Sequence, residues 1–394
     1  MLNLTKLYFG TASESDHLRY GNGHLRSAAE RRPVVVWTVT RTCNLKCVHC
    51  YTDSKAMRYP GELTTDEALG ILEDLAIFRV PAILFSGGEP LLRPDLFKLA
   101  GRARDLGIRT TLSTNGTLIT PAMAEKIRDA GFKYVGISLD GPKVLHDKFR
   151  GVPGAFKSTL EGIRNCIAVG QKVGLRLTLT LHTLPAIEDI FDIVEELKIP
   201  RVCFYHLAYA GRGRSLQSED LTHAETRSAI DRIVERTGNI LSRGQELEVL
   251  TVDNAVDGPY LYMKLQEENP LQAEHALALL QWNGGGRFSS GVGIANIDSE
   301  GNVHPDQFWR HYSVGNVRER KFSEIWSDPN EPLLKRLRDR LPYLKGRCHD
   351  CRFQSICGGA LRVRAEAATG DVWASDPACY LTDQEIKEPA LCPT

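Results

Sequence analysis

Two groups of cysteines are the residues of this sequence best suited to chemistry. Cys43, Cys47 and Cys50 are spaced CxxxCxxC in TRTCNLKCVHCY, directly after a run that is typical of a buried strand. Deprotonated cysteines bind zinc or iron-sulfur clusters. Three thiolates leave one coordination position open, so we expect another ligand to complete this site.

Two completions are possible from the residues alone. His49 could serve as the fourth ligand of a zinc ion, but it lies between Val48 and Cys50 and would have to reach the same ion as its neighbours. Alternatively, three cysteines could hold a four-iron cluster whose remaining iron binds a small molecule. The open position favours the second interpretation.

The second group comprises Cys348, Cys351 and Cys357, spaced CxxCxxxxxC, and Cys379, which follows 22 positions later. Four thiolates can close a coordination shell, so spacing alone fits a zinc ribbon and an iron-sulfur cluster equally well. The other cysteines are predicted to be uninvolved. We expect Cys166 and Cys203 to be small core residues, and Cys392 to be a free thiol near the C-terminus.

Composition and charge exclude several classes of protein. Of the 394 residues, 49 are Lys or Arg and 49 are Asp or Glu, without a long basic run, so nucleic acid is an unexpected partner. No segment has the apolar length of a signal peptide or a membrane span. We therefore expect a cytoplasmic protein without a membrane partner, in which clustered cysteines bind metal rather than form disulfides.

The elements that must position these residues follow an alternating pattern. Short apolar runs alternate with helical segments from Val34 to about residue 240, which is typical of parallel strands joined by helices. The expected strands are 34–40, 82–85, 109–113, 134–139, 175–181 and 202–207. Helices are expected to begin near Thr64, Pro94, Pro121, Ala155, Ile187 and Leu221. Six such units predict an α/β fold, a partial (β/α)6 barrel that stays open on one side.

Short polar motifs follow the first four of these strands. The cysteine motif follows the first, SGGEP (86–90) the second, STNG (113–116) the third and SLDG (138–141) the fourth. In α/β barrels the C-terminal ends of the strands surround one common mouth, where active sites are built. Four sites that are distant in the sequence are therefore expected to lie close together.

The CxxxCxxC motif followed by Tyr51, together with GGEP, resembles the radical S-adenosylmethionine (SAM) superfamily over about residues 33–215. The resemblance implies a four-iron cluster on Cys43, Cys47 and Cys50, whose open iron is chelated by SAM. It also implies reductive cleavage of SAM to a 5'-deoxyadenosyl radical, and an external electron donor such as ferredoxin or flavodoxin.

The same resemblance implies the cofactor-binding residues, of which Tyr51 adjoins the last cysteine. Gly87, Gly88 and Glu89 would meet the amino group of SAM, while polar residues after the next two strands would contact its ribose or carboxylate. These polar residues are Ser113, Asn115, Ser138 and Asp140. Arg150 would pair with the SAM carboxylate. Ordinary turns, helix caps and a solvated arginine are the alternatives.

The C-terminal cysteines resemble the SPASM or twitch type of domain, which carries auxiliary iron-sulfur clusters. Because residues 288–347 contain no cysteine, we expect one auxiliary [4Fe-4S] cluster on Cys348, Cys351, Cys357 and Cys379. The predicted divisions are an N-terminal extension (1–32), the partial barrel (33–240), a bridging region (241–287) and the auxiliary-cluster domain (288–394).

Three flanking segments resemble the tetrapyrrole-modifying branch of the superfamily: LTKLYFGTASESDHLRYG, FYHLAYAGRGR, and VHPDQFW with GNVRERKFSEIW. Within it, the N-terminus and the cysteine motif are closer to enzymes that remove two acetate side chains from 12,18-didecarboxysiroheme, giving iron-coproporphyrin III. This implies a siroheme derivative as substrate. Arg212 and Arg214 would bind its carboxylates, and His304 or His311 its iron. No catalytic acid or base is identified.

Three alternatives stay open. A heme d1 biosynthesis enzyme would act on the same precursor. A peptide-modifying SPASM maturase would often carry an N-terminal recognition domain, for which the residues before Val34 are too few. A zinc or iron-sulfur binding module without activity would not need CxxxCxxC, GGEP and STNG together.

Overall fold

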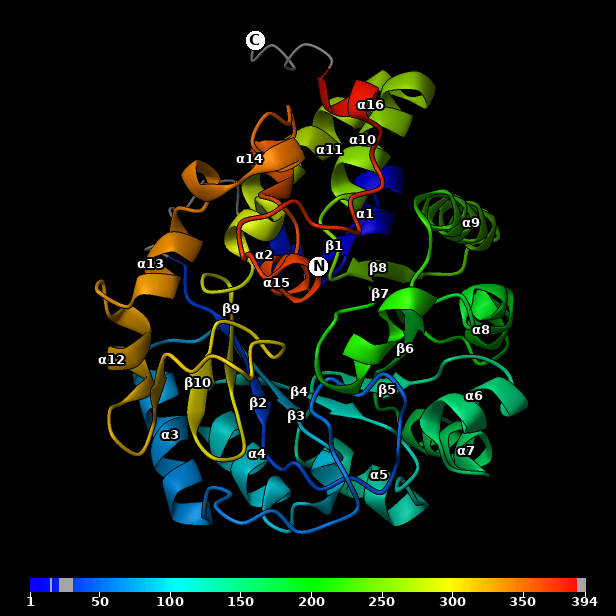
Figure 1. Ribbon diagram of the computed structural model, residues 1–394. Coiled ribbons are helices and arrows are strands. Elements are labelled where there is room, and N and C mark those ends of the chain that lie inside the picture. Colours follow the sequence, from blue (N-terminus) through cyan, green and yellow to red (C-terminus); the bar gives the residue numbers. More distant parts are fainter. Residues whose placement is uncertain (15, 21–30, 388–394) are drawn as a thin grey trace.

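The computed structural model describes residues 1–14, 16–20 and 31–387. Its centre is an 11-stranded sheet with the order β1-β8-β7-β6-β5-β4-β3-β2-β9-β10-β11 (Figure 1). The run from β2 to β8 is parallel throughout. These strands are β2 (Val34–Thr38), β3 (Ala82–Ser86), β4 (Arg109–Thr114), β5 (Val135–Ser138), β6 (Val173–Leu179), β7 (Arg201–His206) and β8 (Glu248–Val252).

Crossover helices connect the parallel strands and lie along the outer face of the sheet (Figure 1). They are α3 (Thr65–Ile77), α4 (Leu96–Asp105), α5 (Pro121–Asp129), α6 (Lys143–Arg150), α7 (Ala155–Ala168), α8 (Ile187–Glu196) and α9 (His223–Ser242). Capping boxes form at Thr64 and Thr222, close to the predicted helix starts, so the side chains that begin α3 and α9 satisfy their first backbone donors. The predicted partial barrel is confirmed, and β8 adds a seventh parallel strand.

The sheet stays open because its two ends pair with short strands instead of with each other. At one end β1 (Leu2–Asn3) is antiparallel to β8. At the other, β9 (Ile294–Ile297) is parallel to β2 and continues as a hairpin through β10 (Asn302–His304) to β11 (Gly315–Asn316). The four predicted domain divisions stay predictions, and β8 continues the sheet beyond residue 240.

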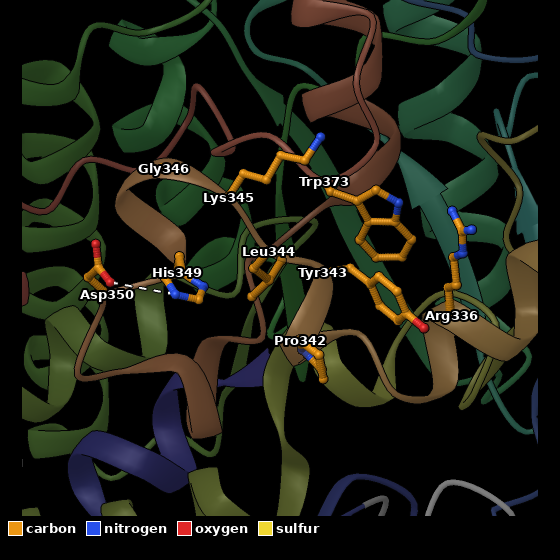
Figure 2. Close-up of a pocket in the computed structure, with 9 residues that line it drawn as sticks. All are labelled: Arg336, Pro342, Tyr343, Leu344, Lys345, Gly346, His349, Asp350 and Trp373. Atoms are coloured by element: carbon orange, nitrogen blue, oxygen red, sulfur yellow. Dashed lines mark ion pairs between the residues drawn. The ribbon is translucent and has the colours of Figure 1, made fainter.

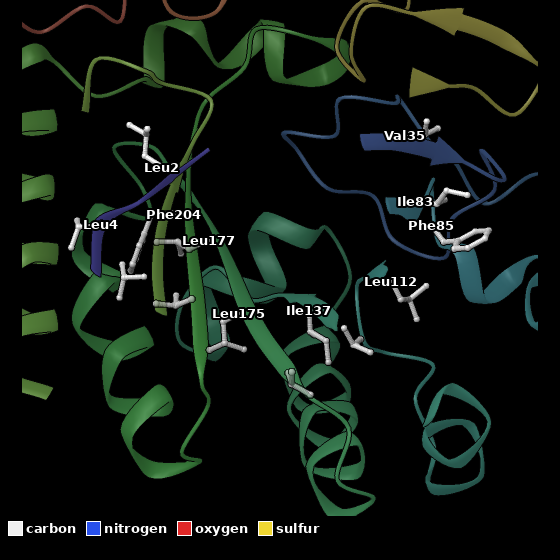
Figure 3. Close-up of a cluster of buried hydrophobic side chains, with 14 of the residues drawn as sticks. Leu2, Leu4, Val35, Ile83, Phe85, Leu112, Ile137, Leu175, Leu177 and Phe204 are labelled. Atoms are coloured by element: carbon white, nitrogen blue, oxygen red, sulfur yellow. The ribbon is translucent and has the colours of Figure 1, made fainter. Parts of the chain in front are cut away.

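The main core lies between the sheet and the crossover helices. Alternate strand residues, among them Val35, Phe85, Leu112 and Phe204, are fully buried on the helix side (Figure 3). The opposite residues of β6 and β7 include Arg176 and Tyr205, which face the inside of the barrel beside Cys203. Apolar residues therefore fix the helices, while the inner face is free to carry polar groups.

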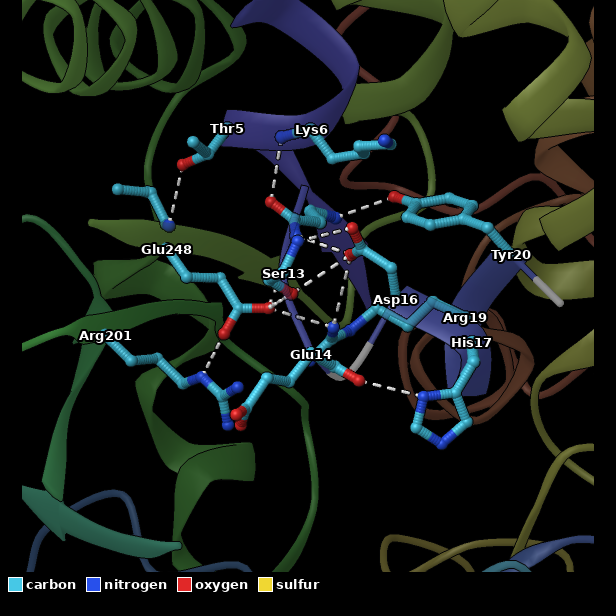
Figure 4. A network of polar contacts seen from close by, with 12 residues as sticks. Thr5, Lys6, Ser13, Glu14, Asp16, His17, Arg19, Tyr20, Arg201 and Glu248 are labelled. Atoms are coloured by element: carbon cyan, nitrogen blue, oxygen red, sulfur yellow. Dashed lines mark hydrogen bonds and ion pairs between the residues drawn. The ribbon is translucent and has the colours of Figure 1, made fainter. Parts of the chain in front are cut away.

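A polar network attaches the N-terminal segment to the barrel. Glu248 of β8 pairs with Arg201 of β7 and, at 3.0 Å, with Arg19 (Figure 4). The side-chain amide of Asn3 also donates to Glu248 and, at 3.0 Å, to Asp16. The helices of this segment are α1 (Leu4–Phe9) and α2 (Asp16–Tyr20). The extension is thus packed against the edge of the sheet.

The C-terminal part is built largely of short helices, from α12 to α16 (Figure 1). The remaining helices are α10 (Asp257–Glu268), α11 (Pro270–Asn283), α12 (Phe322–Ser327), α13 (Pro332–Arg338), α14 (Gln354–Cys357), α15 (Arg362–Thr369) and α16 (Asp383–Lys387). Within the described ranges, no helix has the length and apolarity needed to cross a membrane. Cys392, predicted to be a free thiol, lies outside the described residues.

Candidate functional site

The first three cysteines lie in a loop that follows β2, at the C-terminal end of the barrel strands. Cys43 and Cys47 are buried and Cys50 is half-buried. Each sulfur faces a donor of the protein: the Leu45 amide 3.4 Å from Cys43 Sγ, the Arg150 guanidinium 3.6 Å from Cys47 Sγ and the Ser54 amide 3.5 Å from Cys50 Sγ. Such donors stabilise thiolates that ligate a cluster and tune its potential.

Burial raises the pKa of Cys43 to about 12 and also raises the pKa of Cys47. A bound metal removes these protons, so the loop is suited to a metal-sulfur group rather than to a free thiolate. His49, the alternative zinc ligand, stacks on Phe149 with ring centroids 4.4 Å apart. Among the residues described, no three His, Cys, Asp or Glu side chains are arranged to hold a single metal ion.

The GGEP motif joins the cysteine loop to β3. The Gly88 amide donates to the Thr40 carbonyl at 2.8 Å, and the Glu89 amide donates to the Thr42 carbonyl at 2.9 Å. A Cβ on Gly88 would lie 2.3 Å from the Thr42 oxygen, and one on Gly87 would lie 2.3 Å from the Thr40 oxygen. The two glycines are needed because the loop backbone approaches them too closely for any side chain.

The Glu89 carboxylate connects the ends of β3 and β4. It accepts from Thr114 Oγ1 at 2.7 Å, from the Asn115 amide at 2.8 Å and from the Leu91 amide at 3.1 Å. Burial raises the pKa of Glu89 to about 7. The predicted contact of these residues with the amino group of SAM stays a prediction, and the structure adds a positioning role for Glu89.

The STNG motif also reaches back to the cysteine loop. Asn115 donates to Asn44 Oδ1 at 2.9 Å, and its own Oδ1 accepts from the Thr117 amide at 2.9 Å, which is an Asx-turn. Ser113 Oγ accepts from the Arg176 guanidinium. The Asx-turn that the sequence left as an alternative for Asn115 is therefore present.

The SLDG motif and Arg150 form a buried ion pair beside the cysteines. Arg150 Nη2 lies 2.5 Å from Asp140 Oδ2, and Asp140 also accepts from the Thr178 amide at 3.3 Å. Although burial opposes it, the Asp140 charge raises the pKa of Arg150. Arg150 thus connects β5 to Cys47, and it is not the solvated arginine of the alternative interpretation.

Tyr51 and Ser138 complete the residues predicted around the cofactor. The Tyr51 hydroxyl lies 3.2 Å from Ser86 Oγ, and its ring meets Phe308 edge-on at 5.4 Å. Ser138 ends β5 and is half-buried at the mouth. The polar motifs of four strands therefore surround one place, as expected from the sequence.

The second group of cysteines lines a single cavity. Cys348, Cys351, Cys357 and Cys379 contribute to its wall together with apolar residues such as Phe353. Burial raises the pKa of Cys379 to about 11 and raises that of Cys357 well above its usual value. Four thiols around one enclosed space fit a fully ligated cluster, since no further ligand is required.

The residues predicted to bind substrate differ in their exposure and in their ion pairs. Arg212 pairs with Asp53 at 2.8 Å and donates to the Cys47 carbonyl at 2.8 Å, so it holds the cysteine loop. Arg214 is exposed and, within the described part of the chain, has no carboxylate at ion-pair distance. His311 is exposed and pairs with Glu366 at 2.8 Å.

His304, predicted as a ligand of the substrate iron, lies inside the protein. Its side chain is almost fully buried, Nδ1 contacts the Tyr312 carbonyl at 2.8 Å, and Nε2 contacts Asp298 at 3.4 Å. With both ring nitrogens engaged, His304 holds the β10 hairpin and has no nitrogen left for a substrate iron.

Two cations near the site were missed by the sequence analysis. Arg176 lies inside the barrel over Gly136, where a Cβ would come within 2.2 Å of its Nε. Arg310 donates to the Thr52 carbonyl, and its Nε is buried with no hydrogen-bond partner in the described part of the chain. Burial together with the Arg41 charge lowers the pKa of Arg310. Neither Arg176 nor Arg310 has a carboxylate at ion-pair distance among the described residues. The charged residue in the LRLTLTL strand, where leucines alternate with Arg and Thr, was the available signal for Arg176.

Comparison with known proteins agrees with this geometry. Residues 37–198 match the Radical SAM superfamily, and residues 290–352 match SPASM, an iron-sulfur cluster-binding domain. Fe-coproporphyrin III synthase of Methanosarcina barkeri is 52% identical over 98% of this chain and 99% of its own length. The chain belongs to the radical SAM superfamily.

This radical SAM enzyme has further relatives and structural neighbours. Pre-heme d1 synthase of Dinoroseobacter shibae is 46% identical over 90% of the chain and 87% of its own length. Streptococcus suis SuiB bound to the precursor peptide SuiA superposes with a TM-score of 0.70 at 20% identity, over 91% of this chain and 77% of SuiB. The anSMEcpe enzyme with bound AdoMet and Cp18Cys peptide gives 0.67 at 18% identity, over 91% and 95%. The structural neighbours share the fold.

The cofactors of the enzyme follow from its family and its two domains. They are a [4Fe-4S] cluster with an open iron, SAM, and an auxiliary cluster in the SPASM domain. The cysteine loop, with a donor facing each sulfur, and the four-cysteine cavity both fit these groups.

Proposed function

We propose that this radical SAM enzyme removes the two acetate side chains of 12,18-didecarboxysiroheme to give iron-coproporphyrin III, a step of alternative heme biosynthesis. The observation that carries the proposal is the 52% identity to an Fe-coproporphyrin III synthase over 98% of the chain. The four-iron cluster and SAM would supply the 5'-deoxyadenosyl radical that abstracts hydrogen.

The chain's own residues would hold and shield these groups. We assign Cys43, Cys47 and Cys50 to the first cluster, and Cys348, Cys351, Cys357 and Cys379 to the auxiliary cluster. The backbone of Gly87 and Gly88 and the side chains at the ends of β4 and β5 would bind SAM. Arg150, which contacts both Asp140 and Cys47, would hold the cysteine loop in a fixed position relative to the end of β5.

A tetrapyrrole with several carboxylates needs cations that are not already neutralised. Arg214 on the rim, Arg310 over the cysteine loop and Arg176 inside the barrel have this property among the described residues. Guanidinium groups bind carboxylates through paired hydrogen bonds, which supports a macrocycle bound across the mouth. Arg212 would act indirectly, because Asp53 and the loop carbonyls already occupy it.

The test is an anaerobic incubation of reconstituted enzyme with SAM, a reductant and 12,18-didecarboxysiroheme, with mass spectrometry of the macrocycle and the nucleoside. Loss of two acetate groups together with 5'-deoxyadenosine is the expected result. Formation of 5'-deoxyadenosine with an unchanged macrocycle would contradict the proposed substrate and leave the radical SAM activity intact.

Pre-heme d1 synthase activity is the second candidate, because a relative with that name is 46% identical over 90% of the chain. The same incubation separates the two candidates. The heme d1 precursor has a different mass from iron-coproporphyrin III, so the macrocycle product identifies the reaction. The peptide-modifying alternative has support from the fold alone.

A further inference from the structure

Three fully buried arginines, Arg340, Arg362 and Arg364, occur in the C-terminal part that contains the second group of cysteines. Arg364 is compensated, because it donates two hydrogen bonds to the Asp376 carboxylate, at 2.8 and 2.9 Å. Although burial opposes it, Arg364 and, less strongly, Arg362 lower the pKa of Asp376. Arg340 and Arg362 have no carboxylate at ion-pair distance among the described residues. A buried charge without a close counter-charge is costly, so these two groups need an explanation.

Arg362 connects two walls of the cavity formed by the second group of cysteines. Its guanidinium donates to the Gly359 carbonyl, and also to the Ala374 carbonyl at 2.6 Å and the Val372 carbonyl at 3.1 Å. Gly359 lines the cavity, as does Ser375, which follows Ala374. Nε of Arg362 is buried and has no hydrogen-bond partner in the described part of the chain. The Arg362 charge therefore lies directly behind residues that line the cavity.

Arg340 is the second cation near these cysteines. Its guanidinium donates to the Ser290 carbonyl at 2.8 Å, while Nη1 is buried without a hydrogen-bond partner among the residues described. Burial and the Arg362 charge lower the pKa of Arg340 to about 9, whereas the charges of Asp306 and Cys357 oppose this change. Burial also raises the pKa of Asp306, which makes that carboxyl a weak counter-charge. Two arginines thus act on each other, and one of them on Cys357, with little compensation by carboxylates.

We propose that Arg340 and Arg362 supply the positive charge that compensates the auxiliary cluster and thereby raise its reduction potential. Ligation by four thiolates gives a [4Fe-4S] cluster a net negative charge, and an added electron increases this charge. Neighbouring cations therefore stabilise the reduced state more than the oxidised state. The inference rests on the proposed assignment of the four cysteines to the auxiliary cluster, and it does not depend on the macrocycle that is modified.

The test uses the full chain with Cys47→Ala as the parent, which should hold the auxiliary cluster alone, with about four iron atoms per chain. A redox titration followed by EPR measures the reduction potential of this cluster. Arg340→Gln and Arg362→Gln remove the charge but keep an amide donor. We expect each to lower the ratio of reduced to oxidised cluster about tenfold at a fixed potential, which is a shift of about 59 mV.

The matched control is Arg336→Gln in the same parent. Arg336 lies four positions before Arg340, but it is exposed and lines a surface pocket, where its guanidinium lies 5.4 Å from the centre of the Tyr343 ring (Figure 2). Water and salt screen an exposed charge, so the potential should stay that of the parent. Arg340→Lys and Arg362→Lys keep the charge and should also stay close to the parent.

Iron content and potential separate the possible outcomes. A parent without about four iron atoms would overturn the cysteine assignment together with this inference, whereas a loaded parent leaves the decision to the potentials. Equal potentials in the Gln variants and the parent would overturn the role of the arginines alone. If a Gln variant loses its iron, the Lys variant at that position decides. A retained cluster with the potential of the parent supports the role of charge, and lost iron or a shifted potential overturns it.

Discussion

The cysteine sulfurs show how single residues prepare the site. Cys47 faces the Arg150 guanidinium, whose other partner, Asp140, lies in the loop after β5. The sulfur that we assign to the first cluster is thereby joined to a buried ion pair. Removing a partner from such a pair leaves an uncompensated charge, so we expect loss of either Asp140 or Arg150 to destabilise this region.

Replacement of Cys47 should remove the first cluster and leave the second intact. We expect Cys47→Ala to lose about four of about eight iron atoms per chain and to form no 5'-deoxyadenosine. Iron analysis and nucleoside chromatography measure both. Cys166→Ala, at a buried position in α7, is the control and should keep its iron. Full iron content in Cys47→Ala would contradict the ligand assignment.

The ion pair between His311 and Glu366 predicts a pH effect. The hydrogen bond between His311 and Glu366 raises the pKa of His311 above the usual value. Because the folded pKa exceeds the unfolded one, the stabilisation is complete below about pH 6.5 and disappears as the pH rises through the folded pKa. His311 is 53% exposed, so solvent screening limits the effect to less than about 1 kcal/mol.

Urea unfolding of the wild type and of Glu366→Gln at several pH values measures this effect. The variant should be less stable at pH 5.5 and equal to the wild type at pH 9. A difference that persists at pH 9 would show that Glu366 acts through packing rather than through the charge of His311.

At the scale of elements, the loop after β2 is held by the ends of the neighbouring strands. Gly88 and Glu89 of the β3 end bond its backbone, Asn115 of the β4 end bonds Asn44, and Arg150 follows β5. The polar motifs at the ends of these strands therefore hold one another in position through contacts within the protein itself.

Gly88→Ala tests this arrangement. The added Cβ would lie 2.3 Å from the Thr42 oxygen, so the loop must shift. We expect a loss of about 1–3 kcal/mol in the free energy of unfolding and a reduced iron content at the first site. Gly101→Ala is the control, since nothing lies within 4 Å of its Cβ position in α4, and it should stabilise the helix by about 0.5–1 kcal/mol. Equal iron in both variants would refute the close-approach argument.

At the scale of the whole molecule, segments from both ends of the chain complete the barrel. β1 extends the sheet at β8, and β9 extends it at β2, so the open barrel has short strands at both edges. Glu248 connects the N-terminal segment to β7 and β8 through Arg19 and Arg201. This network spans more than 200 positions of sequence and holds the open side of the fold.

Glu248→Ala should release the N-terminal segment. The substitution removes a buried carboxylate that contacts two arginines, and we expect the free energy of unfolding to fall by about 3–5 kcal/mol. Limited proteolysis with mass spectrometry should detect faster cleavage before residue 34. Glu73→Ala, which breaks an exposed pair with Arg102, should cost less than about 1 kcal/mol. Unchanged cleavage would mean that apolar packing alone holds the segment.

The sequence by itself determined the parallel strands, the capping boxes, the two groups of cysteines and the place of GGEP, STNG and SLDG at strand ends. These features depend on hydrophobic periodicity, helix capping and residue spacing. Such patterns are local, so they can be recognised without knowing which distant residues are in contact. The family could be recognised for the same reason, because its motifs are short and contiguous.

Only the tertiary structure decided what the single charged and polar side chains do. Arg212 and His304 looked available in the sequence, yet Asp53 occupies the first, and Asp298 with the Tyr312 carbonyl occupies the second. Arg176 and Arg310 were not singled out in the sequence, yet the fold places both, half-buried, beside the site without a carboxylate partner among the described residues. Whether a charged side chain is free to bind a ligand depends on its neighbours in space. These neighbours are distant in sequence, and only the packing of the chain brings them close.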